Sequence, residues 1–187
     1  EVIHGVQRAF TVAAIATVMV ACGSGQEATP APVPAAPAQT PSAPAVTLVS
    51  LQDLRASVPQ FTGWTRGEIT AQEGPAPSRS THVQVTFTRG AETLSLEIAD
   101  TGGDERSIES LEHMAGTSTS RTVENGYFKG TTVATFPAVE SWNTVDKLGE
   151  LSVLIRRRYI INVAGAGLSD AQPMRTLAEA VDTSRLR

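Results

Sequence analysis

The chain has 187 residues, of which 41% are hydrophobic and 18% are charged, so it has room for one ordinary soluble domain and little more. Its formal net charge of -4 and its pI near 5.4 provide no basic field that would hold a nucleic-acid backbone, and we expect no nucleic-acid partner. The single cysteine excludes an internal disulfide and a zinc site built from thiolates alone.

The chain begins with an apolar segment that has the features of a secretory signal. Residues 9–21 carry no charge, follow Arg8 and end in small residues. A membrane-spanning helix needs about 20 apolar residues, so this run is too short to cross a bilayer but has the length of a signal-peptide core. We therefore predict a signal peptide over residues 1–21.

The end of this segment, Met19-Val20-Ala21-Cys22, resembles the lipobox of bacterial lipoproteins. In that family the cysteine thiol takes a diacylglycerol and the signal is cut before it, so the resemblance implies that Cys22 is lipidated. It also implies that the membrane is a partner through a lipid anchor in the cell envelope. Gly23, in place of an aspartate, favours the outer membrane facing the periplasm in a Gram-negative cell. A plain secretory signal cut after Ala21 and a buried apolar helix are the alternative interpretations.

Residues 22–46 form a linker dominated by alanine, proline, serine and threonine. Such a segment cannot bury enough apolar surface to offset its ordering entropy, and its prolines favour extended polyproline II structure. We interpret it as a spacer between the anchor and a single folded domain over residues 47–187.

The first part of the domain predicts a helix followed by a hairpin. Residues 48–58 have helical apolar spacing, with Ser50 as the N-cap, Asp53 in the capping-box position and Pro59 as the stop. Residues 82–87 and 93–98 alternate apolar and polar side chains around a turn at residues 89–90, which predicts an antiparallel pair with one dry and one wet face.

The second part predicts a further helix, several strands and a last helix. The helix is expected over residues 107–115, and strands over residues 122–128, 131–136 and 139–142, with Pro137 breaking the pattern. Residues 150–155 and 159–163 form a second hairpin, and residues 169–172 read as the capping box of the last helix. This order predicts an α+β fold with a mainly antiparallel sheet and with helices packed on one face.

The triplet Asp100-Thr101-Gly102 follows an apolar strand and resembles the active-site turn of aspartic proteases. Because those enzymes share a proton between two carboxylates, the resemblance implies a homodimer in which each copy contributes Asp100. This makes an envelope hydrolase the alternative function. The other interpretation is a turn in which the aspartate and the threonine make local hydrogen bonds.

Two further groups are candidates for binding. Arg156, Arg157 and Arg158 lie at a predicted hairpin tip and are candidates for contact with an anion or lipid headgroup, although a run of charge at a tip is also typical of a solvated loop. Four large aromatic residues are candidates to line a ligand or partner groove, or else to lie in the core: Trp64, Tyr127, Phe128 and Trp142.

His82 and His113 have no second ligand at near spacing, so we expect no metal and no other cofactor. The sequence has no nucleophile-elbow, zincin or phosphate-loop motif, and we expect no enzymatic activity. The favoured prediction is a lipid-anchored cell-envelope lipoprotein whose domain binds a small ligand or an envelope protein.

Overall fold

A computed structural model describes residues 46–74, 79–117 and 120–187. The predicted signal peptide, Cys22 and the linker up to residue 45 lie outside the described residues.

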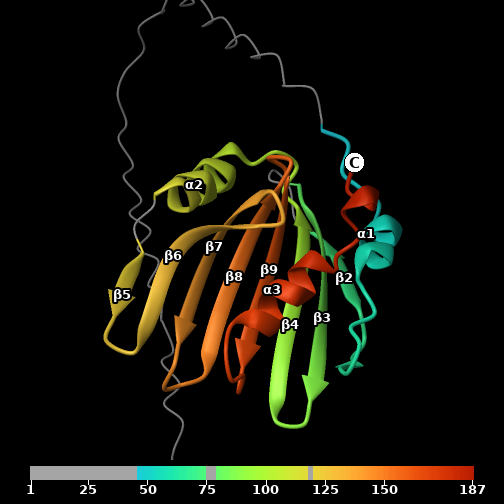
Figure 1. Cartoon of the computed structure of the whole chain (residues 1–187). Coiled ribbons are helices and arrows are strands. Elements are labelled where there is room, and N and C mark those ends of the chain that lie inside the picture. Colours follow the sequence, from blue (N-terminus) through green and yellow to red (C-terminus); the bar gives the residue numbers. More distant parts are fainter. Residues whose placement is uncertain (1–45, 75–78, 118–119) are drawn as a thin grey trace, which may run out of the picture. The chain divides into compact units, whose positions relative to one another are not determined.

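The described residues form one antiparallel sheet accompanied by helices (Figure 1). The strand order is β1-β3-β4-β9-β8-β7-β6-β5, and β2 also pairs with β3. The bounds are α1 Leu51–Ser57, β1 Thr65–Arg66, β2 Thr70–Glu73, β3 Thr81–Arg89, β4 Glu92–Asp100, α2 Glu105–Gly116, β5 Arg121–Val123, β6 Gly126–Val133, β7 Phe136–Asn143, β8 Leu148–Ile155, β9 Tyr159–Ala166, α3 Gln172–Glu179 and a 3₁₀ turn Thr183–Arg185. The predicted α+β class with a mainly antiparallel sheet is confirmed.

The helices lie on both faces of the sheet, so the prediction that they pack on one face is wrong. Met174 of α3 and Leu54 of α1 share a hydrophobic cluster with Ile161 of β9. The adjacent residue of β9, Ile160, packs instead against the cluster that contains Ile108 of α2. Because successive strand residues point to opposite faces, α2 covers the reverse side of the sheet. We call the two sides the α3 face and the α2 face.

The apolar pattern of β8 explains why both faces need cover. Val153 and Ile155 belong to the cluster under α3, whereas Leu154 between them belongs to the cluster under α2. This run of three apolar residues interrupts the alternation that a strand with one wet face would show. Helix α2 packs on β6, β7 and β8 at one end of the α2 face of the sheet and leaves the rest of that face open (Figure 1).

The first predicted helix and hairpin are confirmed, with shifted ends. Helix α1 begins at Leu51, and the Ser50 hydroxyl accepts a 3.1 Å hydrogen bond from the Asp53 amide, as the capping pattern predicted. Strands β3 and β4 pair along their whole length from Thr81↔Asp100 to Arg89↔Glu92. Gly90 begins their turn with φ of +60°, a value that favours glycine.

The strands predicted over residues 122–142 have other limits. A turn at residues 124–125 separates β5 from β6, and Pro137 lies inside β7 instead of breaking it. Pro137 pairs with Thr132 of β6, while pairing with β8 starts only at Ala138. The missing proline N–H therefore interrupts no ladder with β8.

The last helix is present, but its predicted capping box is wrong. Helix α3 begins at Gln172, and its N-cap Ala171 makes no side-chain cap bond. The Asp170 carboxylate accepts a 2.8 Å hydrogen bond from the Gln172 amide instead. Among residues 46–187, apart from the gaps at 75–78 and 118–119, no helix is long and apolar enough to cross a membrane.

Candidate ligand-binding groove

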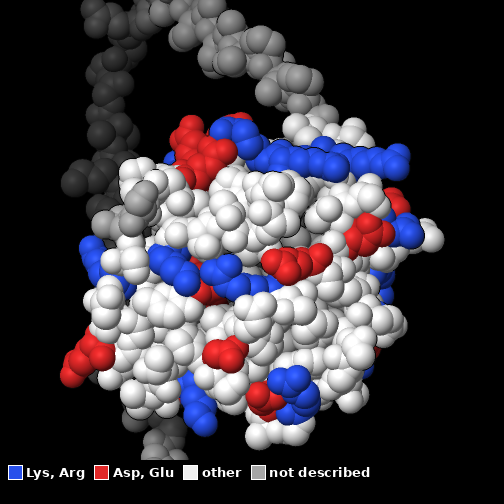
Figure 2. Space-filling model, in the orientation of Figure 1, with Lys and Arg blue, Asp and Glu red and all other residues white. Residues whose placement is uncertain are grey.

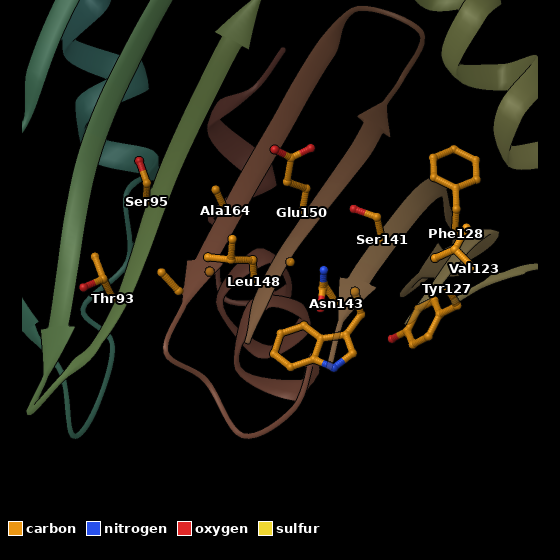
Figure 3. Close-up of a pocket in the computed structure, with 14 residues that line it drawn as sticks. Thr93, Ser95, Val123, Tyr127, Phe128, Ser141, Asn143, Leu148, Glu150 and Ala164 are labelled. Carbon is orange, nitrogen blue, oxygen red and sulfur yellow. The ribbon is translucent and has the colours of Figure 1, made fainter. Parts of the chain in front are cut away.

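The part of the α2 face that α2 leaves open holds a cavity of about 510 Å³, which we call the groove. Strand register places one row of side chains across its middle, running from β4 to β6 (Figure 3): Ser95, Ala164, Glu150, Ser141 and Phe128. A second row beside it consists of Thr93, Ala166, Leu148 and Asn143. The volume lies within the range of roughly 300–1,000 Å³ that small-molecule sites occupy.

Small side chains hollow the middle of the groove, and larger apolar ones line its other parts. Ser95, Ala164 and Ser141 leave space above the sheet, whereas Val123, Phe128 and Leu148 are 48%, 37% and 49% exposed. These three are among only five large hydrophobic residues that are exposed in the described part of the chain. Because scattered exposed apolar residues are ordinary but a cluster in a cavity is not, the groove is the best candidate binding site.

Two glycines make the floor of the groove thin. A Cβ added to Gly149 would lie 2.6 Å from Cε3 of Trp142, and one added to Gly165 would lie 3.1 Å from Sδ of Met174. The side chains of Trp142 and Met174 therefore press against the sheet backbone from the α3 face. Trp142 thus supplies an indole fluorophore directly behind the groove.

A smaller cavity of about 200 Å³ adjoins the groove beneath α2. Leu111 and Met114 of α2 form one wall of it, and it shares Phe128, Ser141 and Glu150 with the groove. The open space therefore extends from the uncovered sheet to the underside of the helix.

Tyr127 at the edge of the groove is held by a buried carboxylate. Its hydroxyl donates a 2.5 Å hydrogen bond to Oε1 of Glu140, which Lys129 Nζ approaches to 3.2 Å. Arg175 Nε lies 2.5 Å from Oε2, off the line of a hydrogen bond. Burial raises the pKa of Glu140, but the tyrosine hydroxyl and the two cations outweigh burial and hold this pKa below its ordinary value. Burial and the Glu140 charge raise the pKa of Tyr127, so its hydroxyl stays protonated.

The four aromatic residues singled out in the sequence do not form one groove. Tyr127, Phe128 and Trp142 are all among the residues that line the groove, but the side chains of Tyr127 and Trp142 pack in the cluster under α3, and only Phe128 lies on the α2 face. Trp64 lies elsewhere, stacked on Phe61 with ring centroids 5.7 Å apart and with the Arg89 guanidinium 4.4 Å from its ring centroid. Trp64, Phe61 and Arg89 line a separate cavity of about 600 Å³ near the start of α3.

The three arginines at the β8–β9 tip all have protein partners. Arg156 donates to the carbonyl of Leu186. Arg157 lies 2.5 Å from Glu112 and 3.2 Å from Glu105. In Figure 2 a strip of basic side chains crosses the upper part of the molecular face beside acidic side chains, and elsewhere on this face the two signs are interspersed. Since these guanidinium groups are already paired, the tip does not present three free cations to an anion.

Arg158 is the partner of Asp100. Its Nε and Nη2 lie 2.8 Å and 2.6 Å from the two carboxylate oxygens, and the Asp100 side chain is fully buried. The amides of Val49 and Gly102 also donate to this carboxylate, at 2.8 Å and 3.0 Å. Burial raises the pKa of Asp100, but these donors outweigh it and hold the pKa below its ordinary value.

This geometry gives Asp100 a structural role. A buried carboxylate whose oxygens are occupied by four donors has neither the access nor the free lone pairs to share a proton with a second copy. It instead ties the first described segment, through Val49, to the adjacent ends of β4 and β9.

Sequence reasoning missed most of the groove, including its central carboxylate, Glu150. Ser95, Glu150 and Ala164 stand at the polar positions of their strands, where alternation predicts a solvated face. The pattern could identify that face but not the part of it that a helix leaves uncovered.

Within the described residues, no cluster of three or more His, Cys, Asp or Glu is placed to hold a metal ion. His82 lies on β3 and His113 on α2, in separate elements. Comparisons of the chain with protein families, curated proteins and solved structures found no match.

Proposed function

We propose that the protein is a lipid-anchored cell-envelope protein whose domain binds a small, largely apolar ligand in the groove, without catalysing a reaction. The observation that carries this proposal is the clustering of Val123, Phe128 and Leu148 around a cavity of about 510 Å³. Exposed apolar surface costs free energy in water, and a ligand that covers it recovers that cost.

The lining chemistry supports binding. The hydroxyl groups of Thr93, Ser95 and Ser141, the amide of Asn143 and the carboxylate of Glu150 provide a few polar contacts within a largely apolar lining, which is the usual composition of a small-molecule site. The buried carboxylates of Asp100 and Glu140 are both engaged in ion pairs outside the groove.

The binding proposal is tested with Nile red, an uncharged dye whose emission rises in apolar surroundings. The full chain is used with Cys22→Ser, so that no acyl chain competes for the dye. Ala164 is exposed at the centre of the groove, and Ala164→Leu fills this space, so we expect affinity to fall about tenfold or more. Fluorescence titration measures the Kd.

The matched control is Thr86→Leu, a position that is also exposed and lies on the same face but does not line the groove. This variant should bind the dye as the parent does. Equal loss in both variants, or no saturable binding in the parent chain, contradicts the proposal.

Anchoring is tested separately by metabolic labelling with a palmitate analogue. The resemblance of Met19-Val20-Ala21-Cys22 to a lipobox leads us to expect label on the wild-type chain in the membrane fraction and none on Cys22→Ser. Because residues 22–46 are expected to separate the cysteine from the domain, the thermal midpoint of the domain should not change. Label on both chains, or on neither, contradicts lipidation at Cys22.

A further inference from the structure

We infer that the ligand of the groove combines an apolar body with a protonated amine, and that the carboxylate of Glu150 binds the amine. This inference rests on the proposed function, because it names the class of ligand that the same groove takes.

Glu150 occupies the centre of the groove. In the row across the sheet its direct neighbours are Ala164 on β9 and Ser141 on β7, and Figure 3 shows the carboxylate between them. Both neighbours are too small to cover it. Within the described residues Glu150 makes no ion pair and no hydrogen bond, in contrast to the buried Asp100 and Glu140, so it is open to an incoming group.

Charge selects a cation over an anion at this position. Of the fourteen residues that line the groove, Glu150 alone is charged, and no lysine or arginine lies among them. A carboxylate or phosphate on the ligand would face this negative charge without a compensating cation. An ammonium group would instead form a charge-assisted hydrogen bond, and the hydroxyl of the neighbouring Ser141 is an additional acceptor for its protons.

The two ends of the groove orient the apolar body. Thr93 and Ser95 make the β4 end polar, whereas Phe128 and Val123 make the β6–β5 end apolar. Phe128 is two strands from Glu150, a separation of about 10 Å from strand spacing. This distance suits a bicyclic aromatic ring or a short alkyl chain that carries the amine at one end.

The test compares three probes that share one ring: naphthylmethylamine, naphthylmethanol and naphthoate. Calorimetric titration of the full chain with Cys22→Ser measures each Kd. We expect the amine to bind on the order of fivefold more tightly than the alcohol, and the naphthoate most weakly. The advantage of the amine should shrink as salt is raised, because the Glu150 side chain is exposed and salt screens its charge.

Glu150→Gln removes the charge while keeping the shape, and should make the amine and the alcohol bind equally. The matched control is Glu97→Gln. It removes a carboxylate from β4, on the same face of the sheet but outside the groove, and should keep the preference for the amine over the alcohol. An amine that binds no better than the alcohol in the parent chain, or an unchanged preference in Glu150→Gln, overturns the inference. If Nile red still binds while the amine shows no advantage, the groove remains a binding site and only the ligand class is wrong. Absence of binding by Nile red and by every naphthyl probe contradicts the proposed function itself.

Discussion

Replacing Arg158 with alanine is expected to destabilise the domain by about 3 kcal/mol, because it leaves the carboxylate of Asp100 buried without its counterion. The same change removes the hydrogen bond from Nη2 to the carbonyl of Thr47, which holds the start of the described chain. Urea unfolding followed by tryptophan fluorescence measures the change.

The control for this experiment is the neighbouring residue. Arg157 pairs with Glu112 and Glu105 on the surface, and its side chain is 56% exposed, so Arg157→Ala should cost at most about 1 kcal/mol. Combining Arg158→Ala with Asp100→Asn removes the stranded charge and should recover part of the loss. Similar losses in Arg157→Ala and Arg158→Ala would show that the Asp100 pair does not behave as a buried one.

The ion pair of Asp100 and Arg158 also makes the stability of the domain depend on pH. Because the pKa of Asp100 is lowered in the folded state, its ionised carboxylate contributes to the free energy of unfolding. This contribution is fully present above the ordinary pKa of 3.8 and is lost as pH falls through the lower pKa of the folded state. In Arg158→Ala the folded pKa rises, so the contribution disappears at a higher pH than in the wild type. The difference in unfolding free energy between the two chains should therefore narrow below about pH 4.

Gly130→Ala is expected to have the second large effect, through the contact of α2 with the sheet. A Cβ at this position would lie 2.4 Å from the carbonyl oxygen of Ala115 and 2.7 Å from that of Met114. Both atoms belong to the helix backbone, so the clash is relieved only if α2 moves as a unit. We expect a loss of about 1–3 kcal/mol in unfolding free energy.

This substitution should also act on the groove. Met114 lines the cavity beneath α2 beside Phe128, so a displaced helix changes the space that a ligand meets there. Nile red affinity should change in Gly130→Ala. Gly116→Ala is the control, because a Cβ at this last residue of α2 meets nothing within 4 Å. Alanine there should leave stability unchanged or raise it by up to about 1 kcal/mol, and leave dye binding intact. An unperturbed Gly130→Ala would contradict the close packing of α2 on β6.

Local patterns in the chain predicted the elements well because their causes lie within a few residues. Ser50 caps α1 through the amide of Asp53, three positions away. The β3–β4 hairpin follows from alternating side chains and a glycine that accepts positive φ at residue 90. The limits of β5 to β7 were predicted less well, because a proline is compatible with a strand wherever its missing N–H faces no partner, as at Pro137.

The sequence by itself determined the α+β class, the hairpins and which strand positions are apolar, because these depend on periodicity and on turn chemistry. Only the tertiary structure decided that α2 covers the face opposite α3, and that it covers one end of that face alone. The groove depends on where α2 packs and on the strand order. Its central row places Ser95 of β4 beside Ala164 of β9, two residues that are distant in the chain and adjacent across the sheet. The partners of Asp100 and of the arginine run were decided in the same way, because Arg158 lies 58 residues from Asp100 in the chain. Contacts over such separations depend on how faces pack together, and no local pattern specifies that packing.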